Sequence, residues 1–275
     1  MKDYARTVYW KGLSTLRQGM TLTELLVRRV AHIHQSDAIL VRDSQRYWTN
    51  LSNENFRQYS HWKGAGIFAD ESRWLALGNE HFRLYKAFAR AIGVTEHPKR
   101  ILEWGCGGGV NATIFGLHAD AYYGVDVSPA SLEECGKQMA AAGAANFTPV
   151  LIEARYPEAV LPSVTPNCDL FLSTYVFELL PSPEYGIRVL KIAHTLLAPG
   201  AVALIQIKFS SDNWRTQARR WGYAKNLAWN ATYRIDEFWK ISAECGFAPN
   251  MITLVPSQPL VSDRNYAYFL LQRPV

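Results

Sequence analysis

Residues 101–115 read ILEWGCGGGVNATIF and carry glycine at positions 105, 107, 108 and 109. A short apolar run ending in an acid, Glu103, comes just before them. Glycine is costly in regular structure because it loses the most backbone freedom on folding. So many glycines at one place therefore indicate a turn where the backbone passes close to a ligand.

The chain around this turn alternates between short apolar segments and amphipathic ones. We expect strands at 100–104, 121–127, 148–153, 168–173, 201–209, 251–255 and 265–273. We expect helices at 129–143, 184–200 and 236–246, with Ser128 and Asp236 as N-caps and stops at Pro199–Gly200 and Gly246. This alternation favours an α/β fold with a doubly wound, mostly parallel sheet of seven strands, in which the last two form an antiparallel edge hairpin.

The part of the chain before the first strand has a helical pattern. Apolar residues recur at helical spacing in 21–33 (Leu22, Leu25, Leu26, Val30, Ile33) and again in 79–93, where Gly93 is the expected C-cap. We predict a helical N-terminal cap or lid over residues 1–99 and a Rossmann-like domain over residues 100–275.

Composition limits the class of protein. The 275 residues are 48% hydrophobic and 19% charged, which is typical of a packed globular chain. We find no transmembrane run and no apolar core of a signal peptide at the N-terminus. The four cysteines form no CxxC pair, so neither a zinc cage nor a disulfide framework is expected, no metal site is predicted, and a reduced cytoplasmic protein is the simplest interpretation.

The formal net charge of +5 is unevenly spread. Residues 1–50 contain eight Lys/Arg and four Asp/Glu, and residues 208–234 contain six Lys/Arg and one Asp. Two basic segments on a mildly acidic body indicate local contact with something anionic more than general nucleic-acid binding.

The glycine-rich turn has a partner some 20 residues further on. In a parallel sheet, ligands bind beyond the carboxyl ends of the strands, and Asp126 ends the second predicted strand. A carboxylate there accepts hydrogen bonds from two ribose hydroxyls. The glycine spacing, however, is E-x-G-x-G-x-G and not the G-x-G-x-x-G of dinucleotide sites, and Glu103 would repel a pyrophosphate. S-adenosylmethionine, with its sulfonium and ammonium, tolerates such an acid.

With these features the sequence resembles the class I S-adenosylmethionine-dependent methyltransferases over residues 100–273. The motifs that carry the resemblance are ILEWGCGGG, YYGVDVS with Asp126, CDLFLSTYVFELLPS and LLAPGAVALIQIKF. It implies a Rossmann-like fold, S-adenosylmethionine as cofactor and S-adenosylhomocysteine as product.

The resemblance also implies roles for single residues. Asp126 would hold the ribose, Val127 would pack on the adenine, and Glu153 would accept from the adenine amino group. Gly105, Cys106 and Gly107 would pass under the methionine part, and Ser173, Thr174 and Tyr175 would end the fourth strand facing the methyl donor. The remaining predicted cofactor contacts are Glu103, Gly109 and Trp62.

Methyl transfer is an in-line displacement that depends mainly on alignment. An oxygen acceptor with a high pKa also needs a base. The candidates are Tyr175 and Glu178 after the fourth strand, with Lys208 and Asp212 at and after the end of the fifth as alternatives. Many relatives carry a histidine shortly after this strand, where this chain has Glu178. Tyr175 as a packing wall and Glu178 as a helix-start charge are the structural alternatives.

Two further regions are candidates for binding the acceptor or the donor. Segment 209–235 follows the fifth strand and mixes tryptophans and tyrosines with arginines, which suits a sugar, an aromatic ring or a phosphorylated acceptor. Its alternative is an amphipathic helix with the arginines on the solvent side. In the cap, Tyr59, His61 and Trp62 are candidates to contact the donor and His81 to point into the cleft, although packing is the favoured role of both histidines.

The leading hypothesis is therefore a methyltransferase that methylates a small molecule or glycan, on a hydroxyl in preference to an amine. The charge pattern admits an anionic acceptor, and no DNA partner and no membrane span are expected. An RNA methyltransferase, a nicotinamide-dependent oxidoreductase and a non-catalytic binding protein are alternatives, and the oligomeric state stays open.

Overall fold

The computed structural model describes residues 23–31 and 33–275, which fall into two compact units, one up to Ser36 and one from Asp37 to Val275. In the first unit residues 23–30 form a helix. Of its predicted apolar face, Leu25 is buried, whereas Leu26, Val30 and Ile33 are exposed and Leu22 lies outside the described residues.

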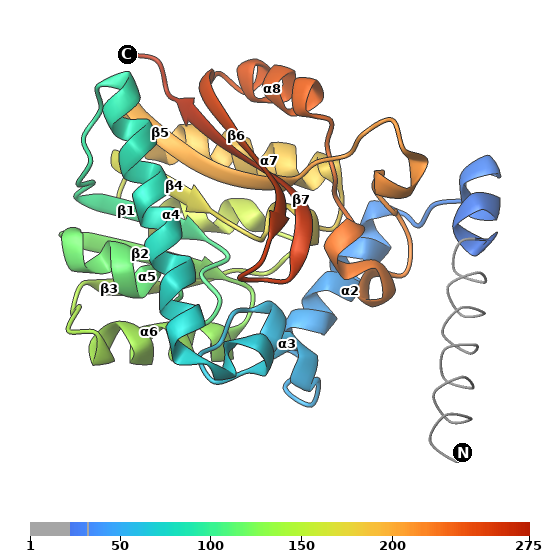
Figure 1. The fold of residues 1–275 in the computed structure, drawn as a ribbon, viewed down its shortest axis with the longest axis horizontal. Helices are drawn as coiled ribbons and strands as arrows, with labels where there is room; N and C mark the ends of the chain where they lie inside the picture. Colours follow the sequence, from blue (N-terminus) through green and yellow to red (C-terminus); the bar gives the residue numbers. More distant parts are fainter. Residues whose placement is uncertain (1–22, 32) are drawn as a thin grey trace. The chain divides into compact units, whose positions relative to one another are not determined.

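The second unit is built on one seven-stranded sheet (Figure 1). Its strands are β1(Arg100–Trp104), β2(Ala121–Asp126), β3(Phe147–Leu151), β4(Cys168–Ser173), β5(Leu197–Lys208), β6(Ala248–Gln258) and β7(Asp263–Gln272). Their order is β3-β2-β1-β4-β5-β7-β6, and all pairs are parallel except β5 with β7 and β6 with β7. The predicted mostly parallel, doubly wound sheet with an antiparallel edge hairpin is confirmed.

Helices cover both faces of this sheet. They are α2(Asp37–Thr49), α3(Glu54–Tyr59), α4(Glu71–Ile92), α5(Ala112–Phe115), α6(Pro129–Ala141), α7(Pro183–Leu196) and α8(Ile235–Glu244). Short 3-10 turns are η1(Gly66–Ala69), η2(Gly116–His118), η3(Pro157–Ser163), η4(Phe177–Leu179), η5(Trp214–Thr216) and η6(Tyr223–Trp229).

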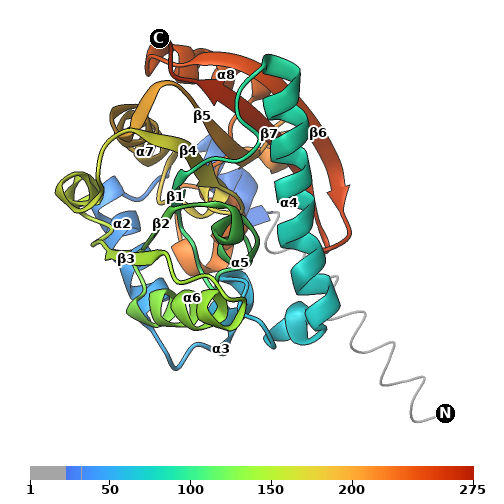
Figure 2. The same cartoon turned by 90° about the vertical axis from the view of Figure 1, so that its left-hand side faces the viewer.

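Alternation along the strands decides which face each side chain joins. Ile101 and Leu170 pack with α4, α5 and α6, whereas their neighbours Leu102 and Phe171 pack with α7 and α8. Figures 1 and 2 show α4 and α7 on opposite sides of the strands. The buried strands are apolar on both sides, as a parallel sheet between two helical layers requires.

Most helix ends agree with the sequence. Ser128 caps α6 by accepting the Ser131 N–H, and Gly93 ends α4 in the left-handed conformation at φ 74°. The N-cap of α8 is Arg234 and not Asp236, because the Glu237 carboxylate reaches back to the Arg234 N–H and caps the helix two residues earlier. Helix α7 ends at Leu196, so Pro199–Gly200 lies inside β5 and does not stop the helix.

Segment 209–235 is not a continuous amphipathic helix, and that alternative is wrong. It contains the short turns η5 and η6, and η6 packs on α2. The Trp48 indole N–H donates to the Tyr223 hydroxyl at 2.7 Å. Arg220 pairs with both Asp37 and Glu184, so this segment is fastened to the start of α2 and the start of α7.

The start of β1 is fixed by one carboxylate. Asp169 Oδ2 in β4 accepts the backbone N–H groups of Lys99 and Arg100, each at 2.8 Å. We expect Asp169→Ala to lower the free energy of unfolding in urea by about 1–3 kcal/mol, because two N–H groups lose their acceptor. The control is Asp120→Ala, whose exposed carboxylate lies 3.6 Å from the Lys99 ammonium and should change stability by less than about 0.5 kcal/mol. Equal losses in the two variants would contradict this account of β1.

Candidate functional site

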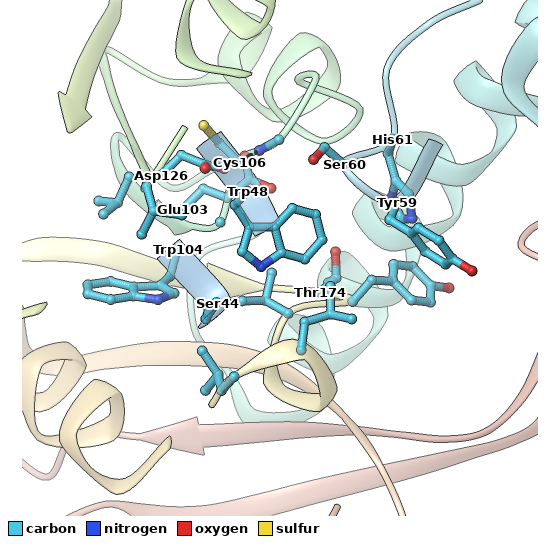
Figure 3. Close-up of a pocket in the computed structure, with 18 of the residues that line it drawn as sticks. Ser44, Trp48, Tyr59, Ser60, His61, Glu103, Trp104, Cys106, Asp126 and Thr174 are labelled. Atoms are coloured by element: carbon cyan, nitrogen blue, oxygen red, sulfur yellow. Dashed lines mark hydrogen bonds between the residues drawn. The ribbon is translucent and has the colours of Figure 1, made fainter. Parts of the chain in front are cut away.

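A pocket of about 810 Å³, including its open mouth, lies at the carboxyl ends of β1, β2 and β4. Figure 3 shows Asp126 and Glu103 toward one end, Tyr59 and His61 at the other, and Trp48 between them. The lining comes from the turn after β1, the ends of β2 and β4, the segment 152–154, residues 179–181 with Tyr185, helix α2 and residues 59–61.

The glycine-rich turn is held between β2 and residues 60–62. The N–H groups of Gly105 and Cys106 both donate to the Val125 carbonyl, and the Gly108 N–H donates to the Ser60 carbonyl at 2.7 Å. Gly107 has φ 50°, and a Cβ there would lie 2.4 Å from the Ser60 oxygen. The turn therefore requires glycine both for its conformation and for its close contact.

Asp126 connects this turn to the end of β2. Its Oδ2 accepts the Gly107 N–H at 3.1 Å and its Oδ1 accepts the Ser128 N–H at 2.8 Å. Burial raises the pKa of this carboxyl to about 6, although the backbone donors oppose the shift. Each oxygen keeps a second lone pair, so the carboxylate can still accept from two neighbouring hydroxyls.

Glu103, at the floor of the pocket, is almost fully buried. Its carboxylate accepts from Asn111 Nδ2 and from the Tyr122 hydroxyl, both at 2.7 Å. Burial, together with the charge of Asp126, raises the pKa of Glu103 to about 8. Two acids with raised pKa values at one end of a pocket favour a cationic ligand there.

Tyr175 lies where the chain leaves β4. Its backbone is left-handed, at φ 57°, which is unusual for a bulky residue. Its N–H donates to the side-chain carbonyl of Gln206, and its hydroxyl lies 3.0 Å from the hydroxyl of Tyr268. Backbone strain of this kind clusters at functional sites, where surrounding contacts hold it in place.

A chain of buried polar contacts leads from Tyr175 back to Glu103. The Tyr268 hydroxyl lies 3.1 Å from His81 Nε2, and His81 Nδ1 lies 2.6 Å from Asn111 Oδ1. Asn111 in turn donates to Glu103 and to Thr174. His81 is thus buried in a satisfied network behind the pocket and does not line it.

The structure brings seven of the predicted site residues together on this pocket. They are Glu103, Gly105, Cys106, Gly107, Asp126, Val127 and Tyr175. Thr174, also expected to face the donor, lines the pocket as well, as do the cap residues Tyr59 and His61. Ile152 and Ala154, which were not predicted, lie beside them.

Five other predicted residues lie outside the lining. Glu153 is exposed, Ser173 is buried with its hydroxyl 3.3 Å from the Trp104 carbonyl, and Gly109 packs on Cys135. Trp62 packs behind the turn with its indole N–H 3.4 Å from the Ser131 hydroxyl. Glu178, the fifth, is buried behind the β4 corner.

Glu178 belongs to a second polar cluster. Burial raises its pKa to about 7, and the charge of Lys208 opposes that rise. Lys208 is itself buried and pairs with Asp263 at 2.6 Å. One Glu178 oxygen has no hydrogen-bond partner among the described residues. The cluster adjoins Tyr175 through Gln206 but does not open onto the pocket.

Sequence reasoning missed the contributions of α2 and of Ser60. Ser44 and Trp48 project from α2 onto the pocket, and Ser60 lies against the glycine-rich turn. Nothing in the local pattern of residues 37–49 marks these two side chains as pocket residues, because their placement depends on packing against η6 and α3.

The pocket fits a nucleoside attached to a cationic amino-acid chain. Asp126 offers two acceptors for a diol, and Val127 and Ile152 offer apolar surface for a base. The glycine-rich turn lies beside them and beside Glu103 and leaves room for the amino-acid chain. Among residues 23–31 and 33–275 no group of three or more His, Cys, Asp or Glu side chains is arranged to hold a metal ion.

Comparison with known proteins identifies a methyltransferase domain in this chain. Residues 78–250 match a family model described as a methyltransferase domain. No curated protein matches the sequence.

Solved structures share the fold at low sequence identity. Magnesium protoporphyrin IX methyltransferase (ChlM) from Synechocystis PCC 6803, with bound S-adenosylhomocysteine, has a TM-score of 0.57 at 14% identity, covering 87% of this chain and all (100%) of that one. N-methyltransferase NodS from Bradyrhizobium japonicum WM9, also with S-adenosylhomocysteine, has a TM-score of 0.53 at 13% identity, covering 72% and 87%. The methyltransferase SibL matches at 21% identity with a TM-score of 0.48, covering 65% of this chain, and the chain spans only 51% of its length.

The matched region is more than half of the chain, so the chain belongs to this methyltransferase-domain family. Its fold is that of the class I S-adenosylmethionine-dependent methyltransferases, as the sequence resemblance predicted. Within the described residues, no helix combines the length and apolarity needed to cross a membrane.

A comparison of two glycine substitutions separates the effect of the close contact at Gly107 from the effect of backbone strain. Gly143 also has positive φ, at 88°, but a Cβ there meets nothing within 4 Å. We expect Gly143→Ala to cost about 1–2 kcal/mol of stability from strain alone and to leave S-adenosylhomocysteine affinity unchanged. Gly107→Ala should lose tenfold or more in affinity by calorimetry, because the turn must move away from Ser60. Unchanged binding by Gly107→Ala would disprove the close-contact account.

Glu103 should make stability depend on pH. Its folded pKa, about 8, lies above its ordinary value of 4.5, so its contribution to stability is present at low pH and is lost as pH rises toward 8. Glu103→Gln keeps an acceptor for Asn111 without the charge. Between pH 5 and 8, the free energy of unfolding of the variant should rise relative to that of wild type by at most about 1.4 kcal/mol per pH unit. The measurement is urea unfolding without cofactor.

The control for this measurement is Glu133→Gln. The Glu133 carboxylate is exposed and pairs with Lys137, which lowers its pKa. That variant should show no gain over the same pH range. A pH-independent difference between Glu103→Gln and wild type would mean that Glu103 is ionised throughout.

Proposed function

We propose that this protein is an S-adenosylmethionine-dependent methyltransferase that methylates a hydroxyl of a small molecule or glycan. The proposal depends on one observation: the glycine-rich turn and the Asp126 carboxylate line the same pocket, and the Gly107 N–H donates a hydrogen bond to that carboxylate. Relatives of the same fold bind S-adenosylhomocysteine, which supports the choice of donor.

In this proposal the predicted residues take the following roles. Asp126 accepts both ribose hydroxyls, Val127 packs on the adenine, and the turn Gly105–Gly107 runs under the methionine chain. Glu103 faces the donor's positive charge. Glu153, Ser173, Gly109 and Trp62 remain predicted contacts, and from their positions the last three would support the turn and the end of β4.

The donor supplies an activated methyl group, so the protein's task is alignment and exclusion of water. Helix α2 and residues 59–61 line one side of the pocket with Ser44, Trp48, Tyr59 and His61. This enclosure favours a small acceptor over a polymer backbone. We propose that α2 to α3 act as the lid that was predicted within residues 1–99.

The RNA alternative depends on free cations in segment 209–235. Arg220 pairs with Asp37 and Glu184, Arg234 pairs with Asp212 and Asp236, and Arg219 lies 5.3 Å from the Trp229 ring centroid. These internal partners leave little charge for phosphate contacts and favour a neutral acceptor. We propose that segment 209–235 stabilises the lid through Tyr223 and does not bind nucleic acid.

Titration calorimetry tests the donor directly. We expect S-adenosylhomocysteine to bind and NAD not to bind. Asp126→Ala should lose about 1.5–3 kcal/mol of affinity, because a charged acceptor is removed, while Glu133→Ala, at an exposed carboxylate paired with Lys137 outside the pocket lining, serves as the comparison. Because the pKa of Asp126 is about 6, wild-type affinity should fall as pH drops below 6 and the Asp126→Ala affinity should not. Tighter binding of NAD than of S-adenosylhomocysteine would overturn the proposal.

A further inference from the structure

His61 lies at the end of the pocket away from Asp126 (Figure 3). It follows α3 in a left-handed conformation, at φ 53°. Its backbone is fixed on both sides: the N–H donates to the Gln58 carbonyl at 3.1 Å, and the carbonyl accepts from the Trp74 indole at 2.7 Å. A strained backbone held in this way directs the imidazole to one place.

The ring is held by two aromatic contacts. The centroids of Phe68 and Tyr175 each lie 5.0 Å from that of His61, both edge-on. Within the described part of the chain, neither nitrogen of this imidazole forms a hydrogen bond. His61 is partly buried and lines the pocket. Burial, aided by nearby His81, lowers its pKa to about 3, which keeps the ring neutral.

The two acids at the other end of the pocket, the Tyr175 hydroxyl and His81 already have protein partners. Asp126 and Glu103 accept two hydrogen bonds each from the protein. The Tyr175 hydroxyl is turned to Tyr268, and both nitrogens of His81 are engaged. A neutral lone pair without a protein partner is therefore found on His61.

We propose that His61 is a catalytic residue that accepts the proton of the acceptor's hydroxyl during methyl transfer. This inference rests on the proposed function. The acceptor oxygen forms a bond to the methyl carbon, the carbon–sulfur bond breaks with its electron pair on sulfur, and the O–H proton passes to an imidazole nitrogen. The positive charge moves from sulfur to His61 and leaves as the proton is released to solvent.

A weak base suffices for this step. A hydroxyl becomes strongly acidic as its oxygen gains a methyl group, so a neutral imidazole can take the proton late in the transfer. A base that stays neutral also accepts a proton across the physiological pH range. The acceptor class that fits is a neutral hydroxyl compound small enough to reach between Tyr59, His61 and Tyr175.

His61→Gly and His61→Asn test the role, because both new residues tolerate the left-handed backbone. The assay is transfer of label from methyl-labelled S-adenosylmethionine into a protein-free cell extract, followed as the mass-shifted product that the wild type makes. We expect a loss of 100-fold or more in both variants, with S-adenosylhomocysteine affinity within threefold of wild type. Added imidazole should restore part of the His61→Gly rate and none of the His61→Asn rate.

The matched control is His97→Asn, which makes the same change at an exposed position and should keep the wild-type rate. A His61→Gly variant that keeps the wild-type rate, or that loses 30-fold in S-adenosylhomocysteine affinity, overturns the proposal; the second result would place His61 on the donor. A wild type that binds S-adenosylhomocysteine but labels no product contradicts the proposed function instead.

Nitrogen-15 spectra of histidine-labelled protein with S-adenosylhomocysteine decide the protonation state without any acceptor. The His61 signals are those missing in His61→Asn. We expect the shifts of a neutral imidazole from pH 5 to pH 8. An imidazolium at pH 7 would overturn the inference, since a charged ring cannot take the proton.

Discussion

The contact between the glycine-rich turn and residues 60–62 is the constraint on which the rest of the site depends. Gly108 donates to the Ser60 carbonyl, and the Gly107 Cα lies so close to that carbonyl that no Cβ fits. The same turn is tied to β2 through Asp126. One short stretch of bare backbone therefore sets the distance between the sheet and the segment that carries Tyr59 and His61.

Two buried networks meet at Tyr175 and hold it against that segment. Gln206 accepts from its backbone, and behind Gln206 lie Glu178 and the Lys208–Asp263 pair. Tyr268 engages its hydroxyl and leads through His81 to the floor of the pocket. Breaking either network would release a strained backbone, so these polar groups serve the position of Tyr175 even though most of them do not reach the pocket.

The sequence predicted those parts of the structure that local chemistry determines. Seven strands, the glycine turn and Asp126 followed from hydrophobic pattern and spacing, because each is set within a few residues of the chain. The N-cap of α8 was wrong by two positions, because the Glu237 side chain and not Asp236 decides where that helix starts. The pocket contributions of Ser44 and Trp48 could not be predicted, since they arise from packing of α2 on η6, segments far apart in the sequence.

The charges of the pocket suit a reaction in which a positive charge enters and leaves. Burial raises the pKa of both Asp126 and Glu103, and the charge of Asp126 adds to the rise at Glu103. A cationic donor beside them relieves the cost of their ionisation, and S-adenosylhomocysteine, which lacks the sulfonium, relieves it less. The electrostatics that favour donor binding therefore also favour exchange of product for a new donor. A neutral base at the opposite end adds no anion to a pocket in which burial already disfavours ionisation of both acids.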